Sequence, residues 1–163
     1  MFGSEVVLSD FTPLPVSYEE RFISEEDEER ITENITKNFL KTALEHPDAE
    51  FYFFPPHSIC YLDSMVRLMH LGMQLETQKL TAHHLLAEDD VYVYVFSDRL
   101  DIIGNLDNYT DTLHYSDGIN TEILNCLRAG KQELTSESVD NYYDEIWSLY
   151  ETFDFSHYGL GER

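Results

Sequence analysis

The hexapeptide Val91–Phe96, Val-Tyr-Val-Tyr-Val-Phe, constrains the fold more than any other segment of this 163-residue chain. Its valines occupy one face of an extended backbone and its aromatic residues occupy the other. A strand that is apolar on both faces is typical of a parallel sheet covered on both sides. Residues 51–54, Phe-Tyr-Phe-Phe, predict a second such strand. The two should be parallel neighbours, because the segment between them is helical in pattern and long enough for a crossover.

Helical patterns surround these two strands. Apolar residues recur every three or four positions from Ser24 to His46, over most of 58–87, from Ser116 to Gly130, and from about Ser136 to Phe153. Ser24 is an N-cap residue, and the acidic run 25–29 lies at the positive end of the first helix. The stripe that this helix should bury is Ile31, Ile35, Phe39 and Ala43, and Leu40 and Leu44 widen it.

The domain organisation follows from these elements. Residues 1–16 should be irregular because Pro13 and Pro15 interrupt regular structure, residues 17–155 should form a single α/β domain, and residues 156–163 should be a polar, frayed tail. Two strands are few for an α/β sheet, and both edges would be open. The chain is therefore expected either to complete a larger sheet with another polypeptide or to form a homo-oligomer through a sheet edge.

Charge and composition exclude several classes of function. The net charge is −22, which repels phosphate backbones and anionic lipid heads, so neither nucleic acid nor a membrane surface is an expected partner. No apolar run approaches the roughly 18 residues of a membrane span, and no signal peptide is visible. The chain is therefore expected either to be cytoplasmic or to be a piece of a protein whose targeting signal lies elsewhere. Cys60 and Cys126 fit buried free thiols. We expect no cofactor and no metal, since adjacent His83 and His84 point in different directions on a helix.

The polar loop from about Ser97 to Tyr115 carries the most chemically suggestive pair, Asp111 and His114. Ligands of open α/β sheets bind in such loops, beyond the carboxyl ends of the strands. The three-residue spacing lets the carboxylate reach imidazole Nδ1–H, which would leave Nε2 free to accept a proton. The same pair at a helix start also fits a purely structural turn, so spacing alone leaves both interpretations open. A calcium loop is disfavoured because Asp107, Asn108 and Asp111 lack its ligand spacing.

Three segments carry a family resemblance: 51–58 (FYFFPPHS), 91–96 (VYVYVF) and 107–116 (DNYTDTLHYS). Together they resemble the carboxyl-terminal half of bacterial SGNH/GDSL-type hydrolases, closest to an uncharacterised branch distantly similar to O-acetylation and D-alanyl-transfer proteins. The resemblance covers roughly residues 20–155. It implies a partial three-layer α/β/α, flavodoxin-like fold with few parallel strands and long flanking helices. It also implies that His114 is a general base, that Asp111 orients it, and that the substrate of a complete enzyme is a small acyl ester. Members of this family are often anchored in a membrane through an N-terminal segment.

The chain departs from the family pattern at the nucleophile and at the oxyanion hole. Its nucleophile is a serine in a Gly-Asp-Ser or Gly-Thr-Ser turn after the first strand, and its oxyanion hole uses a glycine and an asparagine; none of these blocks is recognisable here. Gly3-Ser4 resembles the nucleophile turn only weakly, and Ser58 fits a helix cap better than a nucleophile. Two functions are therefore open. The chain is either the carboxyl-terminal portion of a serine esterase or acyltransferase, inactive alone and completed by a separate N-terminal portion, or a non-catalytic acidic interaction module on a degenerate scaffold.

Overall fold

The computed structural model describes residues 2–12, 23–53, 57–68, 70–158 and 160. The architecture is mixed α/β, as expected, and is built on a small sheet of three strands in the order β1-β2-β3. Strand β1 (Phe51–Phe53) pairs in parallel with β2 (Val91–Tyr94), in a register that sets Tyr52 beside Tyr92. The prediction that these two segments are parallel neighbours in one sheet is confirmed.

The third strand, β3 (Glu133–Leu134), was not expected from the sequence. It runs antiparallel to β2, and two residues are too few to give a recognisable alternation of side chains. The turn before it contains Gly130 and Gln132, both with positive φ values of 60° and 65°. The carbonyl oxygen of Gln132 accepts the backbone N–H of Val95 at 2.9 Å, which extends the pairing beyond the end of β2.

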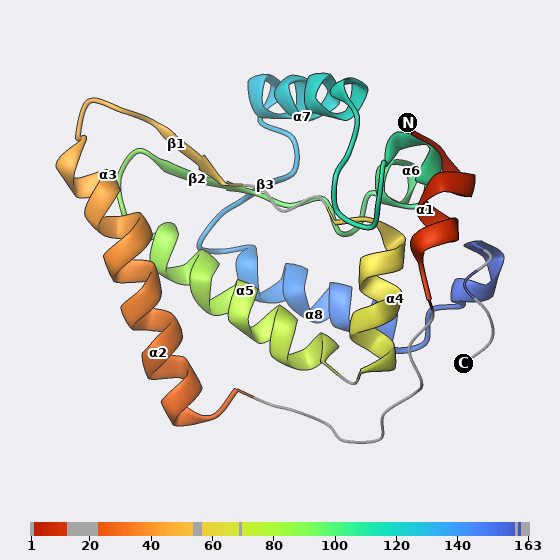
Figure 1. The fold of residues 1–163 in the computed structure, drawn as a ribbon. Helices are drawn as coiled ribbons and strands as arrows, with labels where there is room; N and C mark the ends of the chain where they lie inside the picture. The colour runs from red at the N-terminus through yellow and green to blue at the C-terminus, as the bar shows by residue number, and fades with distance from the viewer. Residues whose placement is uncertain (1, 13–22, 54–56, 69, 159, 161–163) are drawn as a thin grey trace.

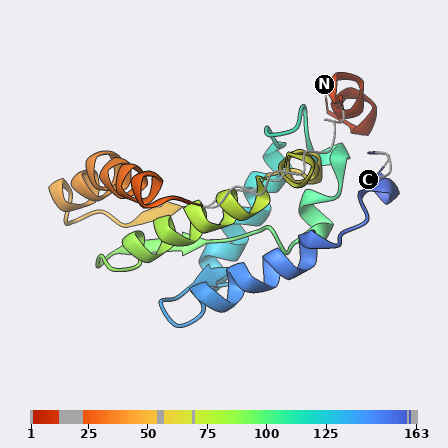
Figure 2. The same cartoon turned by 90° about the horizontal axis from the view of Figure 1, so that it is seen from below.

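Helices lie on both sides of the sheet (Figure 1). The helices α5 (Leu71–Leu85) and α8 (Val139–Glu151) lie on one side, where Figure 2 also shows them side by side, and α7 (Asp117–Ala129) lies on the other. The buried face of α8 consists of Val139, Tyr143, Ile146 and Tyr150. In α7, Ile119 and Ile123 are buried and Leu127 is partly buried, and Gly130 ends the helix in the left-handed conformation.

The first predicted long helix forms with one change of register. Its first part, α2 (Glu25–Ile35), begins at Ser24 with a capping box in which Ser24 and Asp27 bond reciprocally. A π-helical turn, Thr36–Leu40, then joins it to α3 (Lys41–Glu45). The wider turn buries Leu40 in place of Phe39, which is 39% exposed. Phe39 instead contacts Phe53 of β1 edge-on, with ring centroids 5.3 Å apart.

The prediction of one helix over 58–87 is wrong, because two helices occupy this range. Helix α4 (Ile59–Arg67) ends before α5 begins, and the N–H of His70 bonds the carbonyl of Met65, five residues back. The last turn of α4 holds a fully buried ion pair in which both carboxylate oxygens of Asp63 accept from Arg67 Nε, at 2.8 and 2.9 Å. Residues 68–70 between the two helices include neither glycine nor proline, and the apolar pattern continues through them, so it did not reveal the break.

The described residues near each end of the chain form helical structure that the sequence did not predict. Residues 4–10, predicted to be irregular, form helix α1 (Ser4–Asp10) with Val7 fully buried. The carboxylate of Asp107 accepts the N–H and the hydroxyl of Ser4, at 2.9 and 3.0 Å, and these bonds lower the pKa of Asp107. Pro13 and Pro15 lie outside the described residues. A helix capped from a position about a hundred residues away has no local signature in the sequence.

The predicted frayed tail is also wrong for the part that the structure describes. Residues Phe155–Tyr158 form a short 3₁₀ helix, η3, and Phe155 and Leu160 are buried in the core. The carbonyl oxygen of Leu160 accepts from Arg67 Nη2 at 2.8 Å, which ties the tail to the buried ion pair of α4. None of the described helices is long and apolar enough to cross a bilayer.

Candidate active site: the Asp111–His114 pair

Asp111 and His114 lie within hydrogen-bond reach, as their spacing predicts. His114 Nδ1 is 2.7 Å from Asp111 Oδ2, and Asp111 Oδ1 accepts the backbone N–H groups of Leu113 and His114, each at 2.8 Å. A carboxylate only accepts, so the shared proton belongs to His114 Nδ1. In the neutral imidazole, Nε2 then carries no proton and lies on the side of the ring away from Asp111, which is the arrangement that a general base requires.

The turn itself keeps the carboxylate charged. Partial burial raises the pKa of Asp111, but bonds from the backbone of His114 and Leu113 and from the His114 ring outweigh it, so the pKa falls below its ordinary value. Asp111 is therefore ionised throughout the neutral range. Its negative charge would stabilise an imidazolium formed on His114.

Contacts on both sides hold the loop in place. Tyr109 and Tyr115 form an antiparallel bridge across its base, and the N–H of Thr110 bonds the carbonyl of His114 at 2.9 Å. The hydroxyl of Ser58 donates to the Thr112 carbonyl at 2.5 Å. Ser58 immediately precedes α4, the first helix after β1, so the loop lies at the carboxyl-terminal edge of the parallel pair. The expected position of the loop is confirmed.

The chain before the pair is not a simple loop. Residues Leu100–Ile103 form the short helix α6, and Leu106–Asn108 form a 3₁₀ turn, η2. Ile102, Ile103 and Leu106 are buried there. Helix α1 packs against η2 through the Ser4–Asp107 contact, so the N-terminal helix contacts the turn that leads into the candidate site.

Neither of the two candidate serines donates its hydroxyl to His114. Ser4 donates its hydroxyl to Asp107. Ser58 is fully buried and caps α4, accepting the N–H of Tyr61 while it donates to Thr112. Cys60 and Cys126 are buried free thiols, as predicted, and burial raises the pKa of Cys60 to about 12, which makes it a poor nucleophile at neutral pH.

The pair faces solvent. The side chain of His114 is 77% exposed and that of Asp111 is 46% exposed. Among the described residues, Asp111 is the hydrogen-bond partner of the His114 ring. An active site that performs acyl transfer needs a nucleophile and a cover that excludes water. The described residues supply neither at this position. They also contain no cluster of three or more His, Cys, Asp or Glu side chains that could hold a metal ion.

A buried hydroxyl without a partner lies at the base of the loop. Tyr109 is fully buried, its hydroxyl finds no hydrogen-bond partner among the described residues, and burial raises its pKa. Tyr150 is equally buried, but its hydroxyl donates to the Ser97 carbonyl at 2.5 Å. The two tyrosines therefore differ in whether folding compensates the loss of water.

Removing the Tyr109 hydroxyl should stabilise the protein. Tyr109→Phe eliminates an uncompensated desolvation and is expected to raise the free energy of unfolding by about 1 kcal/mol, measured by urea denaturation. Tyr150→Phe is the matched control and should lower it by about 1 kcal/mol. Equal losses in both variants would show that the Tyr109 hydroxyl is satisfied in solution.

Comparisons with protein-family models, with curated proteins and with solved structures found no match to this chain.

Proposed function

We propose that this chain is the carboxyl-terminal portion of an SGNH-type serine esterase or acyltransferase, in which His114 is the general base and Asp111 orients it. The observation that carries the proposal is the 2.7 Å contact between His114 Nδ1 and an Asp111 carboxylate that two backbone N–H groups hold in place. The three-layer, flavodoxin-like arrangement of this family is part of the proposal. The helices on both faces of the sheet favour it, and the antiparallel β3 departs from it.

The proposed chemistry divides the work between two polypeptide portions. His114 Nε2 would take the proton from a serine hydroxyl of the N-terminal portion as its oxygen attacks the ester carbonyl of a small acyl ester. The same nitrogen would return the proton to the alkoxide that leaves when the tetrahedral intermediate collapses, and water or an acceptor alcohol would then release the acyl group. Asp111 would remain ionised and stabilise the imidazolium between these steps.

The open edge of the sheet favours an incomplete domain. Strand β1 has β2 as its one strand neighbour among the described residues, so its other edge carries backbone groups that another strand could pair. Tyr52 of β1 is exposed and stacks on Tyr92, with ring centroids 5.2 Å apart. We propose that the N-terminal portion adds its strands to this edge; a second copy of this chain is the alternative occupant.

The isolated chain is expected to show no esterase turnover on p-nitrophenyl acetate above that of its His114→Ala variant. The comparison corrects for the weak hydrolysis that any exposed imidazole gives. A triad acts as a unit, so a base and its orienting carboxylate keep little of the rate enhancement without a nucleophile. A His114-dependent rate, together with covalent labelling of Ser4 or Ser58 by a fluorophosphonate, would contradict this expectation and identify a complete hydrolase.

A non-catalytic acidic interaction module is the second candidate. The strong exposure of His114 and the net charge of −22 favour it. The reading frame immediately upstream of this chain distinguishes the two functions. We expect it to encode a strand followed by a Gly-x-Ser turn; an upstream region without such a frame would favour the module.

A further inference from the structure

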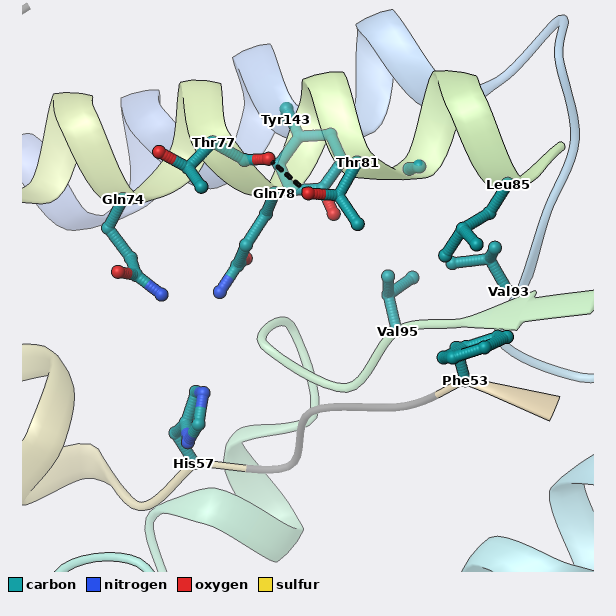
Figure 3. A pocket seen from close by; sticks show the side chains of 11 residues that line it. Phe53, His57, Gln74, Thr77, Gln78, Thr81, Leu85, Val93, Val95 and Tyr143 are labelled. Atoms are coloured by element: carbon teal, nitrogen blue, oxygen red, sulfur yellow. Dashed lines mark hydrogen bonds between the residues drawn. The ribbon is translucent and has the colours of Figure 1, made fainter. Parts of the chain in front are cut away.

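A second feature lies apart from the Asp111–His114 loop: a cavity of about 330 Å³ between α5 and the sheet (Figure 3). This volume lies at the lower end of the range of small-molecule sites, about 300–1,000 Å³, so it is enough for a small organic molecule. The buried apolar side chains that line it come from α5, from β2 and from the residue after β2: Ala82, Leu85, Val93 and Val95.

Besides Tyr143 of α8, which is buried and adds its phenol to the lining, the polar side chains around the cavity fall into two groups. Thr77 and Thr81 donate their hydroxyls to carbonyls of their own helix, both at 2.7 Å. Gln74, Gln78 and His57 have polar atoms that make no hydrogen bond with the described residues, and all three are half-buried. In Figure 3 the two glutamine side chains extend from α5 into the space and His57 extends toward them from the opposite side. Three half-buried polar groups thus converge without partners above an apolar floor.

The uncharged lining indicates which class of ligand the cavity could bind. Among the described residues, the lining includes no Lys or Arg that could hold an anion and no Asp or Glu that could hold a cation. Burial lowers the pKa of His57, so its imidazole is neutral above pH 7 and offers one donor and one acceptor nitrogen. Each carboxamide also offers both a donor and an acceptor. Such a set is complementary to an uncharged group that donates and accepts hydrogen bonds.

We propose that this cavity binds a short aliphatic molecule that ends in a neutral carboxamide, with the chain against Val93, Val95 and Leu85 and the polar end held by Gln74, Gln78 and His57. The site goes beyond the proposed esterase function, because neither Asp111 nor His114 lines it. Its occupancy is therefore measured by binding and does not require an active enzyme.

Hexanamide is the probe, added to the full chain at pH 8 and followed by the side-chain NH₂ signals of Gln74 and Gln78 in ¹H–¹⁵N spectra. With about eight non-hydrogen atoms it should bind with a Kd of about 1 mM or tighter. Hexanoate should bind at least about tenfold more weakly, because a buried carboxylate would find no cation in the lining. The absence of saturable shifts with hexanamide, or equal binding of hexanoate, would overturn the proposal.

Variants separate this site from binding elsewhere. The double variant Gln74→Met/Gln78→Met keeps side-chain length but removes both carboxamides, and it should weaken hexanamide binding at least about tenfold, followed through the backbone amide of Val95. Glu76→Met on the exposed face of the same helix is the matched control and should leave Kd unchanged. Val95→Phe should fill the cavity and abolish binding in a chain whose spectrum shows that it remains folded. Binding to the double variant within twofold of the unmodified chain would overturn the role of the glutamines.

Discussion

Asp63→Ala is expected to lower the free energy of unfolding by about 3–5 kcal/mol, the largest stability effect that we predict for a single side chain in this protein. Asp63 is fully buried, and both of its oxygens accept from Arg67 Nε. Truncation leaves a buried guanidinium without its counter-charge. Because Arg67 also donates to the Leu160 carbonyl, the loss should reach the packed C-terminal segment.

Urea denaturation followed by circular dichroism measures this effect. Asp101→Ala is the matched control, because Asp101 also accepts from an arginine with both oxygens, from Nε and Nη2 of Arg99, but its side chain is 65% exposed. This variant should cost less than about 1 kcal/mol. The double variant Asp63→Leu/Arg67→Met removes both charges and should recover much of the lost stability. A loss below about 1 kcal/mol for Asp63→Ala would mean that water reaches the pair in solution.

The elements that the sequence predicted well are those whose signals are local. Ser24 with its acidic turn marks the start of α2, Gly130 marks the end of α7, and the alternation in 91–96 marks β2. The elements that it missed depend on distant partners. The first residue of α1 donates to Asp107, β3 forms only by pairing with β2, and the carbonyl of Leu160 accepts from Arg67. Periodicity within a window carries no information on such contacts.

The Asp111–His114 pair and the cavity also differ in whether the sequence could predict them. The Asp111–His114 contact follows from a three-residue spacing within one turn, so the sequence was sufficient to predict it. The cavity was missed because His57 and the two glutamines come from separate elements. One signal for it was present: Gln74 and Gln78 stand four residues apart, on the face of α5 that also carries the buried Ala82. This spacing places both carboxamides on one face of the helix, and that placement could have been predicted from the sequence.

For the proposed esterase, reconstituted from this chain and the N-terminal portion proposed above, we expect His114→Ala to lower kcat by about 10⁴–10⁶-fold and Asp111→Asn by about 10⁴-fold. Without His114 no group takes the serine proton. With an amide at position 111 the ring is held in the wrong tautomer, because the amide can donate to Nδ1 and displace the proton to Nε2. The double variant should be no slower than His114→Ala alone, since Asp111 acts through the imidazole.

The measurement is steady-state hydrolysis of p-nitrophenyl acetate by the complex, with fluorophosphonate labelling of the N-terminal portion as a count of competent sites. His83→Ala is the matched control. His83 also bonds an exposed carboxylate, that of Asp140 at 3.0 Å, but it does so through Nε2 and on the α5–α8 side of the molecule. Its kcat should stay within about twofold of the unmodified complex, since surface substitutions away from a site have small effects. If His114→Ala retained comparable activity in a complex that labels fully, the base would lie on the N-terminal portion, and the Asp111–His114 pair would be a turn that stabilises the start of α7.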